Sequence, residues 1–337
     1  HYLVVWQGDE NPGPGVGNTE WEIYVQLLDA DGTELGINDL QISLTGPNGD
    51  PSTDAWDPMV TFNSTGNEFL VVWHAAPNAG GLALFEHEVF AERIDAGTGL
   101  EVGSGEVRIS AFGQDGNAGY SAFRPRPAYN PVNNEYLIVF YGLNALDTDE
   151  YEVYGQRLDA STLAEIGADD FRISDMGPEG NTNYSVEDPM IHYESATHEY
   201  LVTWEGEDDA GALVDGEFEI YGQRIDARSG AQVGPNDFRI SQLGPDGSTD
   251  VNVVRPGSAY NSITGESLVV FERRDWIANP FGLSEIHGQR LGPDSQITGK
   301  SIILAADDGM RASTVALAGE ATFEAWVRLD ESTVGRS

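Results

Sequence analysis

One segment recurs five times along the 337-residue chain, and this repeat constrains the fold more than any other feature. It reads EIYVQLLDADG from Glu22, and its later copies begin at Glu88, Glu152, Glu219 and Glu285. The copies are separated by 66, 64, 67 and 66 residues, which is too regular for chance. A fixed period of this length is typical of propellers, solenoids and other repeat arrays. The sequence therefore consists of about five copies of one unit.

Each unit contains four short apolar segments, bounded by Gly, Pro, Asn and Asp, which have the composition of β-strands. In repeat order they are of the types DPMVTFN, YLVVW, EIYGQRLDA and FRIS. The short polar turn between the first two types predicts a hairpin. The YLVVW type is apolar on both faces, which predicts a sheet packed between two neighbours. Four antiparallel strands per unit make one propeller blade. The prediction is an all-β, five-bladed β-propeller in which residues 1–337 form a single domain.

The phase of the repeat predicts that strands from both chain ends close the ring. The chain begins at a YLVVW segment without its preceding strand, and residues 310–317 have the pattern of that missing strand. Residues 322–327 resemble a further YLVVW segment, so residues 322–337 are interpreted as a surplus strand or the start of another unit. A tandem of β-sandwiches is the competing fold, but 66 residues are few for one sandwich.

The charge balance is strongly acidic, with 56 acidic and 17 basic residues and a net charge of −39. Such a surface repels nucleic acids and anionic membranes, so neither is expected as a partner. Two explanations remain open: adaptation to salty surroundings, as in a halophilic or marine organism, and oxygen-rich calcium sites. The absence of cysteine excludes disulfides and thiolate metal sites. No apolar run has the length of a membrane helix, and no signal peptide is visible.

The combination of YLVVW, EIYGQRLDA and FRIS segments resembles acidic tandem-repeat β-propeller modules of large, uncharacterised extracellular bacterial proteins. The resemblance spans nearly the whole chain, although the first copy has Gln26-Leu27 in place of Gln-Arg. It implies the propeller fold, a secreted or cell-surface location and membership of a longer multidomain chain. It implies no catalytic chemistry.

Calcium is the expected cofactor, because long acidic loops supply the carboxylate and carbonyl oxygens that this ion prefers. The repeated glutamate at the start of each EIYGQRLDA segment is the sharpest candidate ligand. Its alternative role is structural, through pairing with the repeated arginine or hydrogen bonds to the next blade. The candidate metal ligands are Glu22, Glu88, Glu152, Glu219, Glu285, Asp147, Asp149, Glu205, Asp208, Asp209 and Asp215.

A specific function is expected where the blades depart from the repeat. The first position of the innermost strand varies between acidic and basic residues, which predicts a ring of mixed charge that binds a polar ligand or neutralises itself. The candidate channel residues are Arg124, Arg126, His192 and Arg255. Asp57 and Asp188 are the carboxylates at the same position, and a glycoside hydrolase would use such a pair. Arginine neighbours are expected to hold both ionised, which is unfavourable for a general acid.

The function predicted from the sequence is a non-catalytic, calcium-binding extracellular module that binds protein or carbohydrate at a cell surface, as in adhesion. Two alternatives stay open. One is a five-bladed glycoside hydrolase, or a calcium-dependent hydrolase, that uses Asp57 and Asp188. The other is a lectin-like propeller that binds sugars through aromatic side chains such as Trp56, Tyr120 and Trp276.

Overall fold

The computed structural model describes most of the chain up to residue 305. The described residues are 1–9, 20–44, 46, 52–77, 81–103, 105–143, 150–178, 180–208, 213–275, 284–298 and, for the backbone, 302–305. Asp147, Asp149, Asp209, Trp276 and the predicted strands at 310–317 and 322–327 lie outside these residues.

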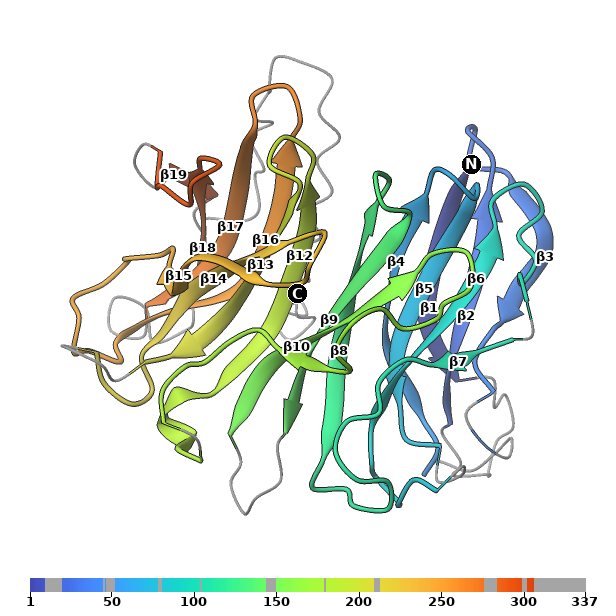
Figure 1. Cartoon of the computed structure of the whole chain (residues 1–337), viewed down its shortest axis with the longest axis horizontal. Helices are drawn as coiled ribbons and strands as arrows, with labels where there is room; N and C mark the ends of the chain where they lie inside the picture. The colour runs from blue at the N-terminus through green and yellow to red at the C-terminus, as the bar shows by residue number, and fades with distance from the viewer. Residues whose placement is uncertain are drawn as a thin grey trace, which may run out of the picture.

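The described chain is all-β, with strands in five antiparallel sheets that follow the sequence order (Figure 1). Sheet 1 contains β1 (Tyr2–Asp9), β2 (Trp21–Leu28) and β3 (Glu34–Gln41). Sheet 2 contains β4 (Ala55–Asn63), β5 (Glu68–Ala75), β6 (Glu88–Asp95) and β7 (Val107–Arg108). Sheet 3 contains β8 (Ser121–Asn130), β9 (Glu135–Leu143), β10 (Tyr151–Asp159) and β11 (Phe171–Arg172).

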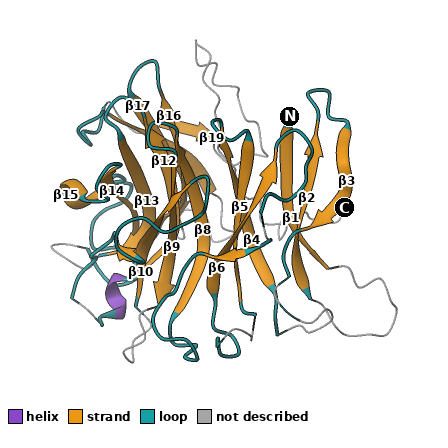
Figure 2. Ribbon diagram, turned by 45° about the vertical axis from the view of Figure 1, so that its right-hand side comes forward, coloured by secondary structure: helices purple, strands orange, loops and turns teal. Residues whose placement is uncertain are grey.

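The last two sheets repeat this pattern. Sheet 4 contains β12 (Val186–Glu194), β13 (Glu199–Glu207), β14 (Phe218–Asp226) and β15 (Gln232–Arg239). Sheet 5 contains β16 (Val251–Asn261), β17 (Glu266–Asp275), β18 (Ser284–Leu291) and β19 (Ile302–Ala305). The helix of the described part is a single 3-10 turn, η1 (Thr182–Tyr184), seen in purple in Figure 2. No helix in the described part has the length and hydropathy to cross a membrane.

Apolar cores fill the spaces between consecutive sheets. The second strand of each of sheets 2 to 4, which carries the YLVVW pattern, is buried along almost its whole length, as the sequence predicts for a sheet covered on both faces. Trp73 and Trp204 are fully buried there, in the cores between sheets 1 and 2 and between sheets 3 and 4. The first strands β4, β8, β12 and β16 pack in turn against one another, which makes them the inner strands.

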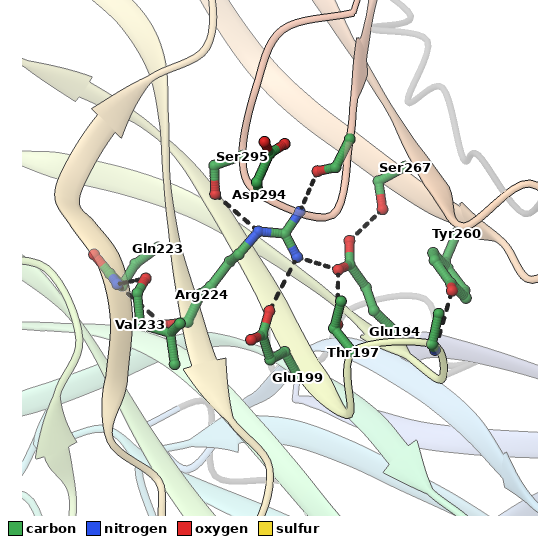
Figure 3. A network of polar contacts seen from close by, with 12 residues as sticks. Glu194, Thr197, Glu199, Gln223, Arg224, Val233, Tyr260, Ser267, Asp294 and Ser295 are labelled. Atoms are coloured by element: carbon green, nitrogen blue, oxygen red, sulfur yellow. Dashed lines mark hydrogen bonds and ion pairs between the residues drawn. The ribbon is translucent and has the colours of Figure 1, made fainter.

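A series of inter-sheet hydrogen bonds comes from the arginine that follows Gln or Glu in the third strand of sheets 2 to 4. Arg93 donates to the Ser161 carbonyl at 2.6 Å, and Arg157 donates to the Arg228 carbonyl at 3.0 Å, in each case in the next sheet. Arg224 likewise donates to the Gly292 carbonyl at 2.8 Å (Figure 3). These contacts tie each sheet to the loop between the third and fourth strands of its successor.

Sheet 1 departs from this rule because Leu27 stands where the other sheets have arginine. His1 Nδ1 lies 2.6 Å from the Ala96 carbonyl of sheet 2. This carbonyl corresponds to that of Ala227, which accepts from Arg157 at 3.2 Å. The histidine therefore replaces the missing guanidinium.

Ring closure, predicted from the phase of the repeat, is not seen in the described residues. There β1 is an edge strand of a three-stranded sheet. What the structure supports is a propeller-like arrangement of five antiparallel sheets.

A bulge opens each inner strand at the same point. The residue before a proline has a positive φ of 53° at Asp57, 48° at Arg124, 48° at Asp188 and 55° at Arg255. Each lies at a break in the register of strand pairing. A left-handed backbone at a residue with a side chain costs about 1–3 kcal/mol and is found preferentially at functional sites. Because these are edge strands, the proline removes no hydrogen bond from the sheet.

Candidate functional site

The bulges place side chains of different chemistry at equivalent points of the inner strands. The residue just before each bulge residue pairs across the sheet with a residue of the second strand, so both side chains lie on one face. These cross-strand pairs are Trp56–His74, Phe123–Tyr141, Glu187–Glu205 and Val254–Glu272. We call the four pairs and the bulge residues Asp57, Arg124, Asp188 and Arg255 the variable ring. Its members differ between sheets, whereas the surrounding framework is repeated.

The bulges also connect the variable ring of one sheet to the sheet before it. The backbone N–H of Asp57 donates to Gln7 Oε1 at 2.8 Å, and that of Arg124 reaches His74 Nδ1 at 3.4 Å. The N–H of Arg255 donates to Glu205 Oε2. Three of the bulges therefore position a side chain of the preceding sheet through their own backbone.

Arg124 lies between the two predicted catalytic carboxylates. It forms an ion pair with Asp188, and its Nε lies 3.6 Å from Asp57 Oδ2. Burial alone lowers the pKa of Arg124, but the charges of Asp188 and then of Tyr141 and Asp57 raise it above its ordinary value. In this part of the ring, mixed charges neutralise each other.

A buried carboxyl pair faces these ions in sheet 4. Glu205 is 8% exposed, and burial, with the nearby charge of Asp188, raises its pKa to about 7. Burial and Asp188 also raise the pKa of its cross-strand partner Glu187. The variable ring thus combines an ion-paired aspartate with a carboxyl group that retains its proton close to neutral pH.

Sheets 2 and 3 contribute an aromatic wall to the same ring. The ring centroid of His87 lies 5.4 Å from that of Trp56 and 5.0 Å from that of Phe123. Phe123 in turn lies 5.6 Å from Tyr141 and 6.3 Å from Tyr151. Burial lowers the pKa of His87 to about 4, so this histidine is neutral at physiological pH. The wall is therefore uncharged.

His74 is neutral as well. Burial is the main cause that lowers its pKa well below the ordinary value, followed by the charges of His87, Arg124 and Arg126.

The other predicted channel residues occupy different surroundings. Arg126 follows the bulge of β8 and donates to the Pro125 carbonyl at 2.9 Å. Arg255 lies 3.4 Å from Glu272 across its own sheet. His192 lies between sheets 4 and 5, with Nδ1 2.8 Å from Ser258 Oγ and Nε2 2.7 Å from Ser267 Oγ. Ligand binding by these side chains stays a prediction.

The repeated glutamates hold the segment that follows the FRIS strand. Glu88 accepts from the Ser110 hydroxyl, from Arg108 at 2.6 Å and from the Phe112 N–H at 3.1 Å. Glu152 and Glu219 have the same serine and arginine partners in sheets 3 and 4. In sheet 1, Gln41 replaces the arginine. Burial raises the pKa of Glu22 to about 7 despite a hydrogen bond from Ser43, and it raises those of Glu88 and Glu152 to about 7 despite their serine and arginine partners.

The remaining predicted metal ligands do not gather at one point. Glu285 lies 3.4 Å from Arg273 and 3.1 Å from His287. Asp215 lies near Glu207, and its charge contributes to the raised pKa of that group. Asp208 is the last described residue before a gap. Calcium binding stays a prediction at all of these positions.

Sequence reasoning assigned Glu205 to an acidic loop and did not single out Glu187, His74 or His87. A signal for these residues was present. Glu205 directly follows the segment YLVTW, at the position occupied by Gln7, His74, Tyr141 and Glu272 in the other units. That position varies in chemistry as much as the bulge residue does.

The sequence matches no protein-family model and no curated protein. Several solved structures are similar in fold. An ulvan lyase bound to a -[GlcA(1-4)Rha3S]- chain has a TM-score of 0.51 at 8% identity, covering 89% of this chain and 67% of that chain. An exo-1,5-α-L-arabinanase from a bovine ruminal metagenomic library has a TM-score of 0.46 at 12% identity, covering 88% and 94%. An N-acetylgalactosamine deacetylase from F. plautii has a TM-score of 0.46 at 14% identity, covering 81% and 79%.

These comparisons correct the function predicted from the sequence. The non-catalytic adhesion or surface module, and with it the prediction that the chain is no enzyme, was wrong, because the similar structure with a TM-score above 0.5 is a polysaccharide lyase. At such low identities the likeness shows the fold alone. A function for this chain must therefore be argued from the chemistry of the variable ring.

Proposed function

We propose that the chain is a glycoside hydrolase that cleaves neutral glycans at the variable ring, with Glu205 as its general acid. The observation that carries this proposal is the carboxyl pair of opposite behaviour. Glu205 has a pKa of about 7, whereas the neighbouring Asp188 forms an ion pair with Arg124. Glycoside hydrolysis needs one carboxyl group that is protonated and another that is ionised, and their surroundings must separate their acidities.

The proposed reaction uses each group once. Glu205 gives its proton to the glycosidic oxygen as the bond from this oxygen to the anomeric carbon breaks. Asp188 stabilises the positive charge that develops on the sugar ring, and Arg124 fixes the position of Asp188 through their ion pair. Water then adds to the anomeric carbon and returns a proton to Glu205, which restores the enzyme.

The aromatic wall supplies a surface for the sugar ring. Trp56, His87 and Phe123 are half-buried and uncharged, so they offer apolar faces beside the carboxylates. Aromatic contacts of this kind contribute about 0.5–1.5 kcal/mol each beyond the area that they bury. The net charge of −39 disfavours a polyanionic substrate. Both features favour a neutral glycan.

A closed propeller is the complete architecture that we propose for this enzyme. Arg290 of sheet 5 occupies the same repeat position as Arg157 and Arg224, each of which donates to a carbonyl of the next sheet. The side chain of Arg290 is 52% exposed and forms an ion pair with Glu266 at 2.5 Å. Its counterpart acceptors in sheet 1 are the carbonyls near Ala30. Cysteines placed at Ala30 and Arg290 should be joined within a monomer by a bismaleimide cross-linker, because the reach of an arginine side chain exceeds the roughly 7 Å between Cα atoms that a disulfide can bridge. A failure to cross-link, or linkage only between two molecules, would contradict closure.

We also propose that the protein acts outside the cell. The acidic composition and the resemblance of the repeats to extracellular modules support this location. Expression of the natural gene followed by fractionation of the culture tests it, and retention in the cytoplasm would contradict it.

The direct experiment is a hydrolysis assay on neutral polysaccharides such as arabinan, xylan and galactan, with release of reducing ends as the readout. The wild type should release reducing sugars from at least one glycan, and water labelled with ¹⁸O should place the label in the product. Glu205→Gln should lose this activity while remaining folded. Activity retained in Glu205→Gln would overturn the role of Glu205. Chain cleavage that gives unsaturated, unlabelled sugars would instead identify a lyase.

A further inference from the structure

An acidic cluster lies beside the aromatic wall, in sheet 2. Glu86 and Glu88 flank His87 at the start of β6, and Asp115 belongs to the loop that leads to β8. One carboxylate oxygen of each residue lies within 4.8 Å of the others. Three carboxylates from two loops thus converge on one point, although exposed acidic groups often do so without a ligand.

The side chain of Glu86 distinguishes this cluster from an ordinary acidic surface. It is 0% exposed, and its Oε2 accepts from the N–H groups of Ala83 at 2.6 Å and Gly116 at 2.9 Å. Its Oε1 is buried and has no hydrogen-bond partner among the residues that the structure describes, as is also the case for Oε1 of Glu150 at the same repeat position of sheet 3. A buried carboxylate oxygen without a partner is strongly unfavourable, and a bound ion or water is the usual explanation.

The charges of the cluster are not balanced by its own arginine. Arg108 donates to Glu88 at 2.6 Å and to Asp115 at 2.8 Å, so one positive charge faces three carboxylates. The Gly81 carbonyl oxygen borders the same loop, 3.6 Å from where a Cβ on Gly116 would stand. Asp115 is 49% exposed, which leaves the cluster open to solvent. A divalent cation would add the positive charge that a group of converging carboxylates favours.

We propose that Glu86, Glu88 and Asp115 bind a divalent cation, with a preference for Ca²⁺. Carboxylate and carbonyl oxygens from flexible loops, completed by water, are the ligands that Ca²⁺ accepts, whereas Mg²⁺ demands a stricter octahedral arrangement. The cation binds Glu86 Oε1 and joins the loop before β6 to the loop before β8. Because His87 lies between two of the ligands, the cation also fixes one end of the aromatic wall. This site is separate from the proposed catalytic carboxylates.

Sheet 4 provides a matched control. Its corresponding residues are Glu217, Glu219, Asp246 and Arg239, and Arg239 pairs with both Glu219 and Asp246. Glu217 Oε2 accepts from the Val214 N–H at 3.3 Å and the Gly247 N–H at 2.8 Å. Its other oxygen is not among the buried atoms without a partner. Within the described residues, the three carboxylates of sheet 4 do not gather as those of sheet 2 do.

The test is calorimetric titration of the chelator-treated protein with CaCl₂ or MgCl₂ in about 0.15 M salt, which screens weak binding to the acidic surface. The wild type should bind Ca²⁺ more tightly than Mg²⁺, with a rise in Tm of several degrees. Glu86→Gln should weaken Ca²⁺ binding at least tenfold, and Glu217→Gln should leave it unchanged. Asp115→Asn should also weaken Ca²⁺ binding. Because Asp115 lies in an exposed turn, this variant serves as the test if Glu86→Gln fails to fold.

Three results would overturn the proposal. The first is the absence of both binding heat and a Tm shift in the wild type. The second is wild-type affinity in Glu86→Gln or, should that variant not fold, in Asp115→Asn. The third is equal loss of binding in Glu86→Gln and Glu217→Gln, which would identify general attraction to the acidic surface. Equal affinity for Mg²⁺ would overturn the preference for Ca²⁺.

Discussion

The two ends of the β12–β13 hairpin carry the same unfavourable feature, a pair of glutamates directly opposite each other across the strands. At the turn end the pair is Glu194 and Glu199, and at the bulge end it is Glu187 and Glu205. At the turn end Arg224 lies between the two carboxylates (Figure 3). At the bulge end a third carboxylate, Asp188, lies close by instead.

The acidities of Glu194 and Glu205 diverge accordingly, whereas burial raises the pKa of Glu199 even beside Arg224. Burial alone raises the pKa of Glu194, but hydrogen bonds from His192, Arg224 and Ser267 lower it to about 2. Glu205 accepts one backbone N–H, that of Arg255, and its pKa rises to about 7. A pair of buried carboxyl groups can therefore serve either as part of the structural framework or as a source of a proton. Arg224, His192 and Ser267 together keep Glu194 ionised as part of the framework, whereas Glu205 accepts a single backbone N–H and keeps a proton that is available for chemistry.

The largest expected effect comes from removing the proton at the bulge end. Glu205→Gln should lower kcat by about 10²–10⁴-fold, the usual contribution of a general acid, with little change in KM. Its stability at pH 7 and above should not fall, since the amide replaces a carboxyl group that burial disfavours in its charged form. Steady-state kinetics and thermal melting measure the two effects. Loss of activity together with loss of folding would contradict the functional assignment.

The next effect comes from removing the guanidinium at the turn end. Arg224 is 2% exposed, so Arg224→Met leaves Glu194 and Glu199 without their buried partner. The free energy of unfolding should therefore fall by about 3–5 kcal/mol. The matched control is Arg290→Met, because Arg290 is the exposed arginine at the same repeat position and should contribute less than about 1 kcal/mol. Urea unfolding measures both variants, and equal small losses would disprove the role of Arg224.

The two ends should respond to pH in opposite directions. Glu194 has a folded pKa below its ordinary value of 4.5, so its stabilisation is present above about pH 4.5 and is lost as the pH falls towards 2. Glu205 has a folded pKa above 4.5, so stability falls as the pH rises from about 4.5 to 7, by up to roughly 3 kcal/mol.

The contribution of Glu205 to the pH dependence of stability is separated from that of the net charge by comparing Glu205→Gln with the wild type. The difference in unfolding free energy between the two proteins should change with pH between about 4.5 and 7 and be constant below that window. A difference that is independent of pH throughout would contradict the raised pKa.

The smallest expected effect concerns the aromatic wall, which has no counterpart at the turn end. Trp56→Ala should raise KM about threefold to tenfold, the loss of one aromatic contact, while kcat changes less. The corresponding control is Tyr193→Ala at the turn end, where Tyr193 packs on Tyr200 with ring centroids 5.5 Å apart. That variant should leave KM unchanged. An equal rise in KM for both variants would contradict a wall that binds substrate.

The sequence predicted the repeated parts of this molecule well and the site only in outline. The period of the glutamates and the YLVVW pattern were enough to predict the strands and their order in each sheet. They also predicted the burial of the second strand, which contains Trp73 and Trp204, because strand burial depends on the local pattern of apolar residues. The variable ring was partly predicted through Asp57, Arg124 and Asp188.

Glu205 was assigned to a loop because the sequence does not show where strand pairing continues past YLVTW. The bulge before Pro189, which brings Asp188 next to Glu205, depends on tertiary packing that no local pattern records. The structural role of Glu88 and its equivalents was left open for a related reason. Arg108 and Ser110 lie 20 and 22 positions away along the chain and meet Glu88 only in the folded sheet.

The proton held by Glu205 is the central claim, and its titration tests that claim most directly. Side-chain carbonyl chemical shifts of ¹³C-labelled glutamate, recorded from pH 3 to 9 for the wild type and for Glu205→Gln, identify the signal of this residue by its disappearance in the variant. The account predicts that this signal titrates with a midpoint of about 7. A midpoint at or below 4.5 would mean that Glu205 is ionised at neutral pH, and the proposed general acid would have no proton to give.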